Sequence, residues 1–269
     1  MKIIPKKSLG QHFLNSPGVL RKIVDASQIV QDETVLEIGP GTGVLTDELL
    51  KKSDRVIAIE KDDRAYALLG EKYATEIISG KLELLHGDIL ELDRATIGLK
   101  DGGYAVVANI PYYITGAILE SFLEHAPRPQ RMVLLVQKEV AERIVARDGK
   151  ESILSVSVKA FGVPRIVATV PPGAFTPPPT VDSAILEISG INSTDRVAHF
   201  TDSEHTRRFF TIVKTAFAHK RKFTIRNLEA LFDINTLEQA WQQTGLDPKV
   251  RSEDIPVSKW IELANALAK

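Results

Sequence analysis

The chain has 269 residues, of which 43% are hydrophobic and 26% are charged, a balance typical of globular proteins. It contains no cysteine, which excludes disulfides, a cysteine nucleophile and a thiolate metal site, and its six histidines do not cluster with acids at ligand spacing. No apolar stretch is long enough for a membrane span or a secretory signal. We therefore expect a cytoplasmic protein with no metal and no membrane contact, and we expect a monomer.

The first half of the chain predicts alternating helices and strands. A helix is expected over 16–29, because Ser16 suits a cap, Pro17 suits a first turn and apolar residues recur at helical spacing. Apolar β-like runs then alternate with helical patterns, which favours a parallel sheet covered by helices on both faces. The expected strands are 34–38, 55–59, 82–85, 104–108 and 132–136, and the expected helices are 43–52, 63–73, 116–124 and 138–146.

The pattern changes after Phe161. Two β-like segments, 165–170 and 184–188, flank a proline-rich loop and are expected to form an antiparallel pair at the sheet edge. From Ser203 onward the sequence predicts only helices, over 204–218, 223–232, 236–245 and 257–267. Turn residues cluster at 190–193. We therefore expect an α/β domain with a Rossmann-like sheet over 1–190 and a small all-helical domain over 191–269.

Basic charge is concentrated near both ends of the chain. The formal net charge is -1, yet residues 1–24 hold five Lys or Arg residues, residues 207–228 hold seven, and neither segment contains an acid. A solvated helix face is the ordinary interpretation of such a run, and contact with nucleic acid is the alternative. Arg207, Lys214 and Arg221 are spaced seven apart, which predicts that they share one helical face.

A glycine-rich turn directly follows the first strand of the predicted sheet. It contains Gly39, Gly41 and Gly43, and glycine lets a backbone approach a ligand closely. The helix that begins beyond the turn offers free N–H groups to an anion. A dinucleotide fingerprint has its third glycine one residue later. The spacing therefore disfavours NAD and is compatible with a ligand that carries a carboxylate and no pyrophosphate.

Acidic residues close the next two strands. Glu60 ends the second strand, where a carboxylate can accept both hydroxyls of a ribose, and Asp88 follows the third, where it can read an adenine edge. Taken singly, a turn glycine, a surface glutamate and a capping aspartate are ordinary structural features. Because the carboxyl ends of successive parallel strands meet at one edge of a sheet, the three together predict a nucleotide-type site.

The most specific motif, Asn109-Ile110-Pro111-Tyr112, follows the fourth strand. The side-chain oxygen of Asn109 and the carbonyl of Ile110 can accept the hydrogens of an aromatic amine such as adenine N6, which directs its lone pair toward a methyl donor. Pro111 fixes φ and has no N–H to compete, and Tyr112 supplies a ring that can stack on a base. The alternative is an ordinary X-Pro turn with a buried tyrosine.

With these motifs the sequence resembles the kasugamycin-resistance family of dimethyladenosine transferases, which modify small-subunit ribosomal RNA. The match extends over essentially the whole chain, through residues 8–14 (SLGQHFL), 37–43 (EIGPGTG), 109–112 (NIPY), 175–183 (FTPPPTVDS), 216–217, 221–222 and 251–254. The resemblance implies a class I methyltransferase fold. It also implies that S-adenosylmethionine lies against His12, Leu14, Gly39, Gly41, Glu60, Asp88 and Asn109.

The resemblance further implies the substrate and its contacts. Two methyl groups would be transferred to N6 of each of two adjacent adenosines near the 3′ end of the small-subunit RNA, in a role linked to ribosome biogenesis. A flipped adenine would lie between Tyr112 and Phe175, whose proline-rich loop has little conformational freedom. The alternative for Phe175 is a core aromatic at a strand end. The basic N-terminal segment and a set of C-terminal residues would hold phosphates, namely Arg207, Lys214, Arg221 and Lys222.

Two positions depart from the family pattern, and three other functions are alternatives. His12 stands where many relatives carry Asn, and Glu151-Ser152 stands where Tyr-Gly is frequent. A large-subunit adenine methyltransferase of the macrolide-resistance type shares the loop and the Asn-x-Pro-Tyr motif, but the long C-terminal signature argues against it. A DNA adenine methyltransferase more usually carries Asp-Pro-Pro-Tyr and a recognition insert. A non-enzymatic ribosome assembly factor would not need the intact acids and Asn109.

Overall fold

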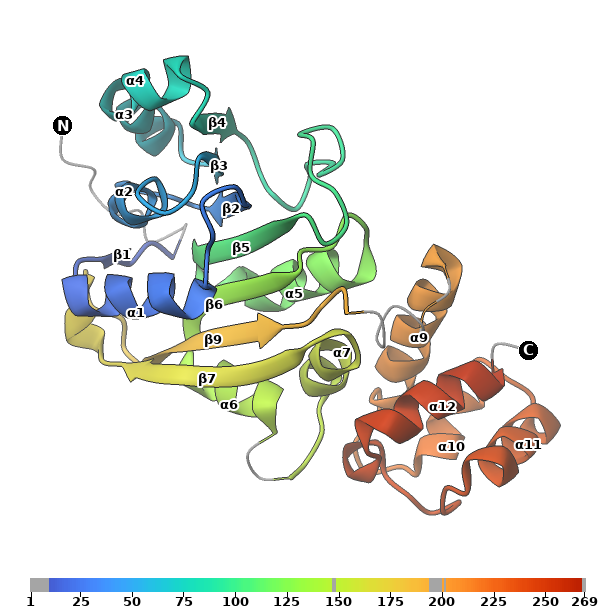
Figure 1. Cartoon of the computed structure of the whole chain (residues 1–269). Coiled ribbons are helices and arrows are strands. Elements are labelled where there is room, and N and C mark those ends of the chain that lie inside the picture. Colours follow the sequence, from blue (N-terminus) through green and yellow to red (C-terminus); the bar gives the residue numbers. More distant parts are fainter. Residues whose placement is uncertain (1–9, 147–148, 194–199, 201, 268–269) are drawn as a thin grey trace.

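The computed structural model describes residues 10–146, 149–193, 200 and 202–267. Figure 1 shows a central sheet with helices on both of its faces and the C-terminal helices gathered at one side. Among the described residues, no helix is both long and apolar enough to cross a membrane.

The sheet has seven strands in the order β4-β3-β2-β5-β6-β9-β7. Its first five members are parallel, and β9 pairs antiparallel with both β6 and β7. The five predicted parallel strands and the antiparallel pair at the edge are therefore confirmed. The strands are β2 (Thr34–Ile38), β3 (Arg55–Glu60), β4 (Leu82–His86), β5 (Tyr104–Asn109), β6 (Arg131–Gln137), β7 (Val163–Val170) and β9 (Ser183–Ser189).

Side chains that alternate along the strands build an apolar core on each face of the sheet. In β5, for example, Val106 joins the cluster on one face and Val107 the cluster on the other, and both are fully buried. Continuously apolar strands are expected where helices cover both faces. One cluster includes residues of α1 (Pro17–Ser27), α2 (Val44–Leu49) and α3 (Asp63–Lys72), and the other includes residues of α5 (Thr115–Glu124), α6 (Lys138–Val145) and α7 (Ile153–Phe161).

The helix α7 was not predicted from the sequence. Its N-terminus is fixed by a capping box, in which the Ser152 side chain accepts a hydrogen bond from the Ser155 backbone N–H at 3.2 Å and the Ser155 hydroxyl accepts from the Ser152 N–H. Glu151 precedes the cap and pairs with Lys159 at 2.8 Å. The departure from the family at Glu151-Ser152 therefore lies at the start of a helix, where it supplies the cap.

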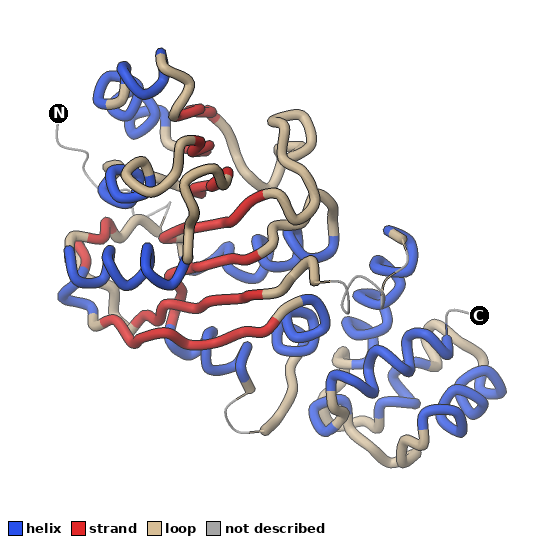
Figure 2. Tube along the Cα trace, in the orientation of Figure 1, coloured by secondary structure: helices blue, strands red, loops and turns tan. Residues whose placement is uncertain are grey.

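The C-terminal part is helical, as predicted, and Figure 2 shows it as helices joined by loops. It consists of α9 (Ser203–Ala216), α10 (Thr224–Leu228), α11 (Ile234–Thr244) and α12 (Val257–Leu267), with a short 3-10 turn at Ser252–Asp254. A further short helix, α4 (Ala74–Ile78), belongs to the first half of the chain and lies between α3 and β4 in sequence.

The apolar core continues across the predicted domain boundary. Phe161 of α7 stacks on Phe200 and on Phe210 of α9, with ring centroids 4.4 and 5.5 Å apart. Phe209 meets the same group edge-on, and the Arg128 guanidinium lies over the Phe161 ring. The boundary at 190–193 follows directly after β9, and the division into two domains stays a prediction.

A small second sheet ties the N-terminal segment to the proline-rich loop. In it β1 (Phe13–Leu14) pairs antiparallel with β8 (Phe175–Thr176). The Asn15 side chain donates to the Thr176 hydroxyl at 2.6 Å, and a 3-10 turn at Pro172–Ala174 leads into β8. The two segments are far apart in sequence, with 161 positions between Asn15 and Thr176, and they are joined beside the carboxyl ends of the parallel strands.

Candidate active site

A cavity of about 180 Å³ lies at the carboxyl edge of the parallel strands. It is lined by the glycine-rich turn after β2, the end of β3, the residues that follow β4, the motif that begins at the end of β5, and the N-terminal segment around β1. The cavity contains every predicted cofactor residue, namely His12, Leu14, Gly39, Gly41, Glu60, Asp88 and Asn109, together with Ile110, Pro111 and Tyr112. The residues at these strand ends therefore lie around one cavity, which is consistent with the expectation from the sequence that they share one site.

Glu60 holds the glycine-rich turn. Its carboxylate accepts a hydrogen bond from the Gly41 N–H at 2.9 Å and another from the Asp62 N–H at 2.8 Å. Burial raises the pKa of the Glu60 carboxyl, while the backbone donors act in the opposite direction. Each carboxylate oxygen can accept more than one hydrogen bond, so the group retains acceptor capacity toward the cavity.

Asp88 is engaged by a neighbouring lysine. Its carboxylate pairs with the Lys61 ammonium at 2.6 Å and accepts from the Leu90 N–H at 3.0 Å. Burial acts to raise the pKa of Asp88, but Lys61 and the Leu90 N–H outweigh it and the net change is a decrease. Asp88 is therefore ionised at neutral pH and is available to a ligand as an acceptor.

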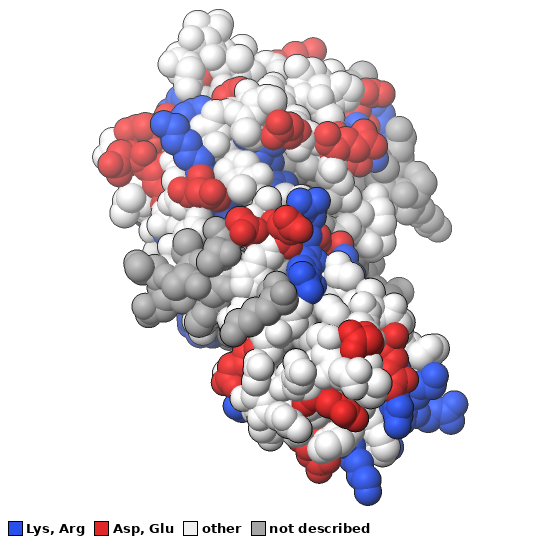
Figure 3. Space-filling view, turned by 90° about the vertical axis from the view of Figure 1, so that its right-hand side faces the viewer, with Lys and Arg blue, Asp and Glu red and all other residues white. Residues whose placement is uncertain are grey.

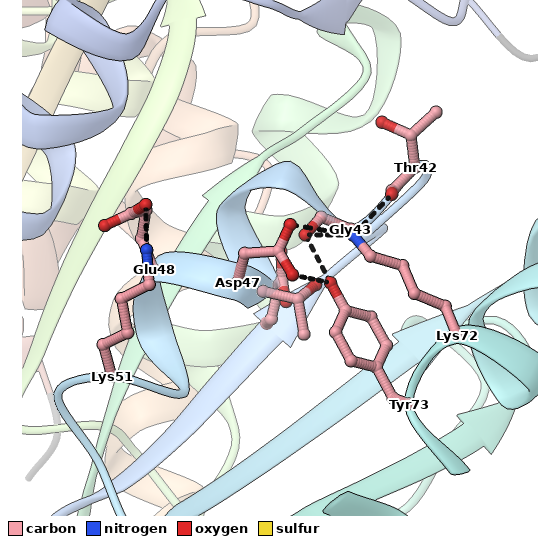
Figure 4. A network of polar contacts seen from close by, with 9 residues as sticks. Thr42, Gly43, Asp47, Glu48, Lys51, Lys72 and Tyr73 are labelled. Carbon is pink, nitrogen blue, oxygen red and sulfur yellow. Dashed lines mark hydrogen bonds and ion pairs between the residues drawn. The ribbon is translucent and has the colours of Figure 1, made fainter. Parts of the chain in front are cut away.

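Lys72 and Tyr73, at the C-terminal end of α3, hold the last residue of the glycine-rich turn in place (Figure 4). The Tyr73 hydroxyl lies 2.6 Å from the Gly43 carbonyl oxygen and 2.8 Å from an Asp47 carboxylate oxygen. Lys72 pairs with the same carboxylate at 2.8 Å. Gly43 has φ of +79°, and a Cβ built on it would lie 2.5 Å from the Tyr73 hydroxyl oxygen. The turn therefore needs glycine here both for its backbone conformation and for the space that Tyr73 fills.

Asn109 is oriented by a backbone contact from the N-terminal segment. Its Nδ2 donates to the His12 carbonyl oxygen at 3.1 Å, which leaves Oδ1 as the acceptor. Ile110 is buried, and Pro111 has φ of -58°. The side-chain amide is thus fixed at the point where β5 ends and the cavity begins, and the N-terminal segment is the part of the chain that fixes it.

Tyr112 is held in place by two neighbours. Its hydroxyl lies 2.5 Å from the Ser183 hydroxyl, and burial raises the pKa of the phenol. The His12 ring is stacked against it with centroids 5.9 Å apart and 20° between the planes. His12 also contacts the Pro177 carbonyl oxygen at 2.8 Å through Nδ1. His12 therefore links Tyr112 to the proline-rich loop, a role that its position in the motif did not indicate.

Phe175 does not line the cavity. It pairs with Leu14 across the small sheet and is 3% exposed, within the apolar cluster that also includes α1. The structure thus places it as a core aromatic at a strand end, the alternative considered from the sequence. Its stacking on a target base stays a prediction and requires the side chain to leave this cluster.

The prediction that Arg207, Lys214 and Arg221 share one helical face is wrong. The helix α9 ends at Ala216, so Arg221 lies beyond it and cannot share a helical face with Arg207 and Lys214. Lys214 is paired with Glu120 at 2.5 Å and lies 3.9 Å from Glu124 of α5. On the face shown in Figure 3, basic and acidic side chains are interspersed.

Arg221 and Lys222 lie in the exposed turn between α9 and α10. They line a shallow surface depression with Phe223, Arg226 and Glu229. Arg226 pairs with Glu229, whereas the side chains of Arg221 and Lys222 make no hydrogen bond or ion pair to another described residue. Of the four predicted RNA contacts, these two are therefore the freest to meet phosphates. Residues 1–9 of the basic N-terminal segment, including Ser8 and Leu9 of its motif, lie outside the described residues.

The fold and the site together define a class I methyltransferase. A mostly parallel sheet carries a glycine-rich turn after β2, an acid at the end of β3, and an Asn-Ile-Pro-Tyr motif after β5, all of which line one cavity. The sequence profile of the ribosomal RNA adenine dimethylase family matches residues 5–269. The chain therefore belongs to this family, which confirms the resemblance found in the sequence.

Individual relatives agree with this assignment. The ribosomal RNA small subunit methyltransferase A of Dehalococcoides mccartyi is 41% identical over 260 residues, covering 96% of this chain and 87% of the relative. The protein of the same name from Enterococcus faecalis is 36% identical over 275 residues, covering 98% and 90%.

Two solved structures share the architecture. A dimethyladenosine transferase from Plasmodium falciparum has a TM-score of 0.74 and 28% identity, and the match covers 94% of this chain and 96% of that one. The 23S rRNA methyltransferase ErmE has a TM-score of 0.70 and 24% identity, over 96% of this chain and 100% of that one, a likeness that concerns the fold alone.

Proposed function

We propose that the protein transfers methyl groups from S-adenosylmethionine to N6 of two adjacent adenosines near the 3′ end of small-subunit ribosomal RNA. The observation that carries the proposal is the anchoring of Asn109 by the His12 carbonyl, which leaves the amide Oδ1 as an acceptor in the cavity. The small-subunit target is supported by the names of the relatives that are 36% and 41% identical. The likeness to the large-subunit enzyme ErmE concerns the fold alone.

The residues present fit the proposed cofactor. A Cβ built on Gly39 meets no atom within 4 Å, so this stretch of the turn faces space that a ligand can fill. Glu60 and Asp88 offer acceptors for hydroxyl and amino groups, in keeping with an adenosine. We propose that His12, Leu14, Gly39, Gly41, Glu60, Asp88 and Asn109 hold S-adenosylmethionine, which supplies a methyl group on a positively charged sulfur.

The residues of the motif then act on the target amine. Asn109 Oδ1 and the Ile110 carbonyl oxygen accept its two hydrogens, which orients the lone pair and favours the positive charge that develops on nitrogen. No strong base is required, because an alkylated amine becomes acidic and releases its proton to water. Tyr112 keeps its own proton at neutral pH, because burial raises its pKa, and it contributes a ring surface for the base.

The proposed RNA contacts lie on α9 and in the turn that follows it. Arg221 and Lys222 are exposed and free of ion pairs among the described residues, so they can neutralise phosphates. Among the described residues, the Arg207 side chain donates only to the Ser203 carbonyl oxygen of its own helix, at 3.4 Å, and we retain it as a phosphate contact. Lys214 is bound to acids of α5, and its contact with RNA is the least supported of the four.

Transfer of a labelled methyl group tests the proposal. The protein is incubated with labelled S-adenosylmethionine and undermethylated small ribosomal subunits, with large subunits as the control, and the modified nucleoside is identified by mass. We expect dimethyladenosine in the small-subunit RNA alone. Label on the large subunit would overturn the assignment of the target. Binding to small subunits without any label would instead favour an assembly factor.

A further inference from the structure

Glu37 and Glu60 are two of the acids that line the cavity. Glu60 was expected to bind cofactor, whereas Glu37, in the glycine motif just before Gly39, was given no role by the sequence. Glu37 lies in β2, lines the cavity and is 1% exposed. A carboxyl group buried this deeply needs a reason, because burial of a charge is costly unless it is paired.

The contacts of Glu37 leave one side of its carboxyl group without a protein partner. Its Oε2 accepts a hydrogen bond from the Thr46 hydroxyl of α2 at 2.6 Å. No other hydrogen bond or ion pair joins the Glu37 side chain to a described residue. Glu60, by contrast, is held by two backbone N–H groups. Of these two acids, Glu37 therefore has fewer protein partners for its carboxyl group.

The charged groups around Glu37 do not supply that neutralisation. Asp47 of α2 and Glu60 of β3 are acids, and Tyr73, directly after α3, is a neutral phenol whose pKa is raised, chiefly by burial. Among the described residues, the cation that acts on Glu37 is Lys72 of α3, which is paired with Asp47 (Figure 4). Burial raises the pKa of Glu37 to about 8, with Glu60 and Asp47 adding to the rise and Thr46 and Lys72 opposing it. At neutral pH the carboxyl group keeps its proton.

We propose that Glu37 is a further cofactor-binding residue. Its carboxyl group gives up its proton to the solvent when the positively charged sulfur of S-adenosylmethionine enters the cavity. The inference rests on the proposed function. The O–H bond of Glu37 breaks, the proton goes to the buffer, and the carboxylate formed stabilises the ligand cation through the cavity that both occupy. No other bond changes.

The same exchange distinguishes the cofactor from its product. Transfer of the methyl group converts the positively charged sulfur into a neutral thioether, which removes the charge that holds Glu37 ionised. The carboxylate then takes up a proton again, because a buried charge without a partner is unfavourable. Glu37 therefore favours binding of S-adenosylmethionine over S-adenosylhomocysteine and promotes release of the product.

Calorimetric binding in two buffers tests the inference. S-adenosylmethionine and S-adenosylhomocysteine are each titrated into the full chain at about pH 6.5, in phosphate and in a buffer with a large ionisation enthalpy, and the difference in heat gives the number of protons released. We expect S-adenosylmethionine to release nearly one proton more than S-adenosylhomocysteine. Glu37→Gln keeps the shape and the Thr46 contact, and it should abolish this difference and weaken S-adenosylmethionine at least about tenfold, with S-adenosylhomocysteine little changed.

A control variant and the behaviour of the unaltered protein separate the possible outcomes. Glu60→Gln should weaken both ligands and leave the difference in proton release intact, because Glu60 is expected to bind the part they share. Equal proton release by both ligands in the unaltered protein, or an unchanged difference in Glu37→Gln, would overturn the inference. Failure of the unaltered protein to bind either ligand would instead contradict the proposed function.

Discussion

Alanine substitutions at Gly39 and Gly43 should separate cofactor binding from folding. Both glycines have positive φ, +65° and +79°, so each substitution incurs a backbone cost of about 1–2 kcal/mol. Their surroundings differ. A methyl group at Gly39 meets no protein atom within 4 Å, whereas at Gly43 it would lie 2.5 Å from the Tyr73 hydroxyl oxygen and 3.0 Å from a methyl carbon of Leu69.

The overlap at Gly43 has to be relieved by movement, and overpacking of this kind costs about 1–3 kcal/mol more. We therefore expect Gly43→Ala to lower the free energy of unfolding by about 3 kcal/mol or more, and Gly39→Ala by no more than about 2 kcal/mol. Gly39→Ala should nevertheless weaken the binding of S-adenosylmethionine at least about tenfold, because the methyl side chain of the alanine enters the cavity that Gly39 lines.

Urea unfolding without cofactor and calorimetric titration with S-adenosylmethionine measure the two quantities. Adding Tyr73→Phe to Gly43→Ala should recover part of the lost stability, since it removes the closest atom. Equal losses of stability at the two glycines, or unchanged cofactor affinity in Gly39→Ala, would refute the reasoning.

Three further predictions follow from individual contacts. Glu33→Gln should lower the free energy of unfolding by about 3 kcal/mol in urea denaturation, because it leaves the Arg131 guanidinium of a buried pair without its partner charge. The matched change Glu48→Gln, in an exposed pair, should have little effect. Because the pKa of Glu37 is raised on folding, its protonated carboxyl group stabilises the folded protein fully below pH 4.5, and this contribution is lost as the pH rises through about 8. Unfolding of the cofactor-free protein across this range should therefore show a loss relative to Glu37→Gln of no more than about 5 kcal/mol. For binding to small subunits, Lys222→Ala should reduce the slope of the logarithm of the binding constant against the logarithm of the salt concentration by about one, whereas Lys214→Ala should leave that slope unchanged.

Much of the sheet and the site could be predicted because their signals are local. Buried parallel strands form continuous apolar runs, as in β5 and β6, and the residues that follow them meet at one edge by topology alone. The glycine-rich turn, Glu60, Asp88 and Asn109 were identified in this way, and all of them line the cavity.

The features that escaped prediction depend on contacts between distant segments. The strands β1 and β8 have two residues each, too few to show a period, and their pairing places Phe175 in the core. The helix α7 has alternating polar and apolar residues from Leu154 to Val158, a pattern more typical of a strand, and its capping box decides the outcome. No glycine or proline marks the end of α9, so its extension to Arg221 could not be excluded from the sequence.

The most direct test of the central claim concerns the side-chain amide of Asn109. Single-turnover methyl transfer to small ribosomal subunits is measured for the unaltered protein and for Asn109→Ala, with Asn15→Ala as the control, since Asn15 is exposed and lies outside the cavity. We predict that Asn109→Ala slows transfer about a hundredfold or more while Asn15→Ala retains the rate. Transfer by Asn109→Ala at a rate within about threefold of the unaltered protein would contradict the account, because the change in activation free energy would be less than half of that expected for such a contact.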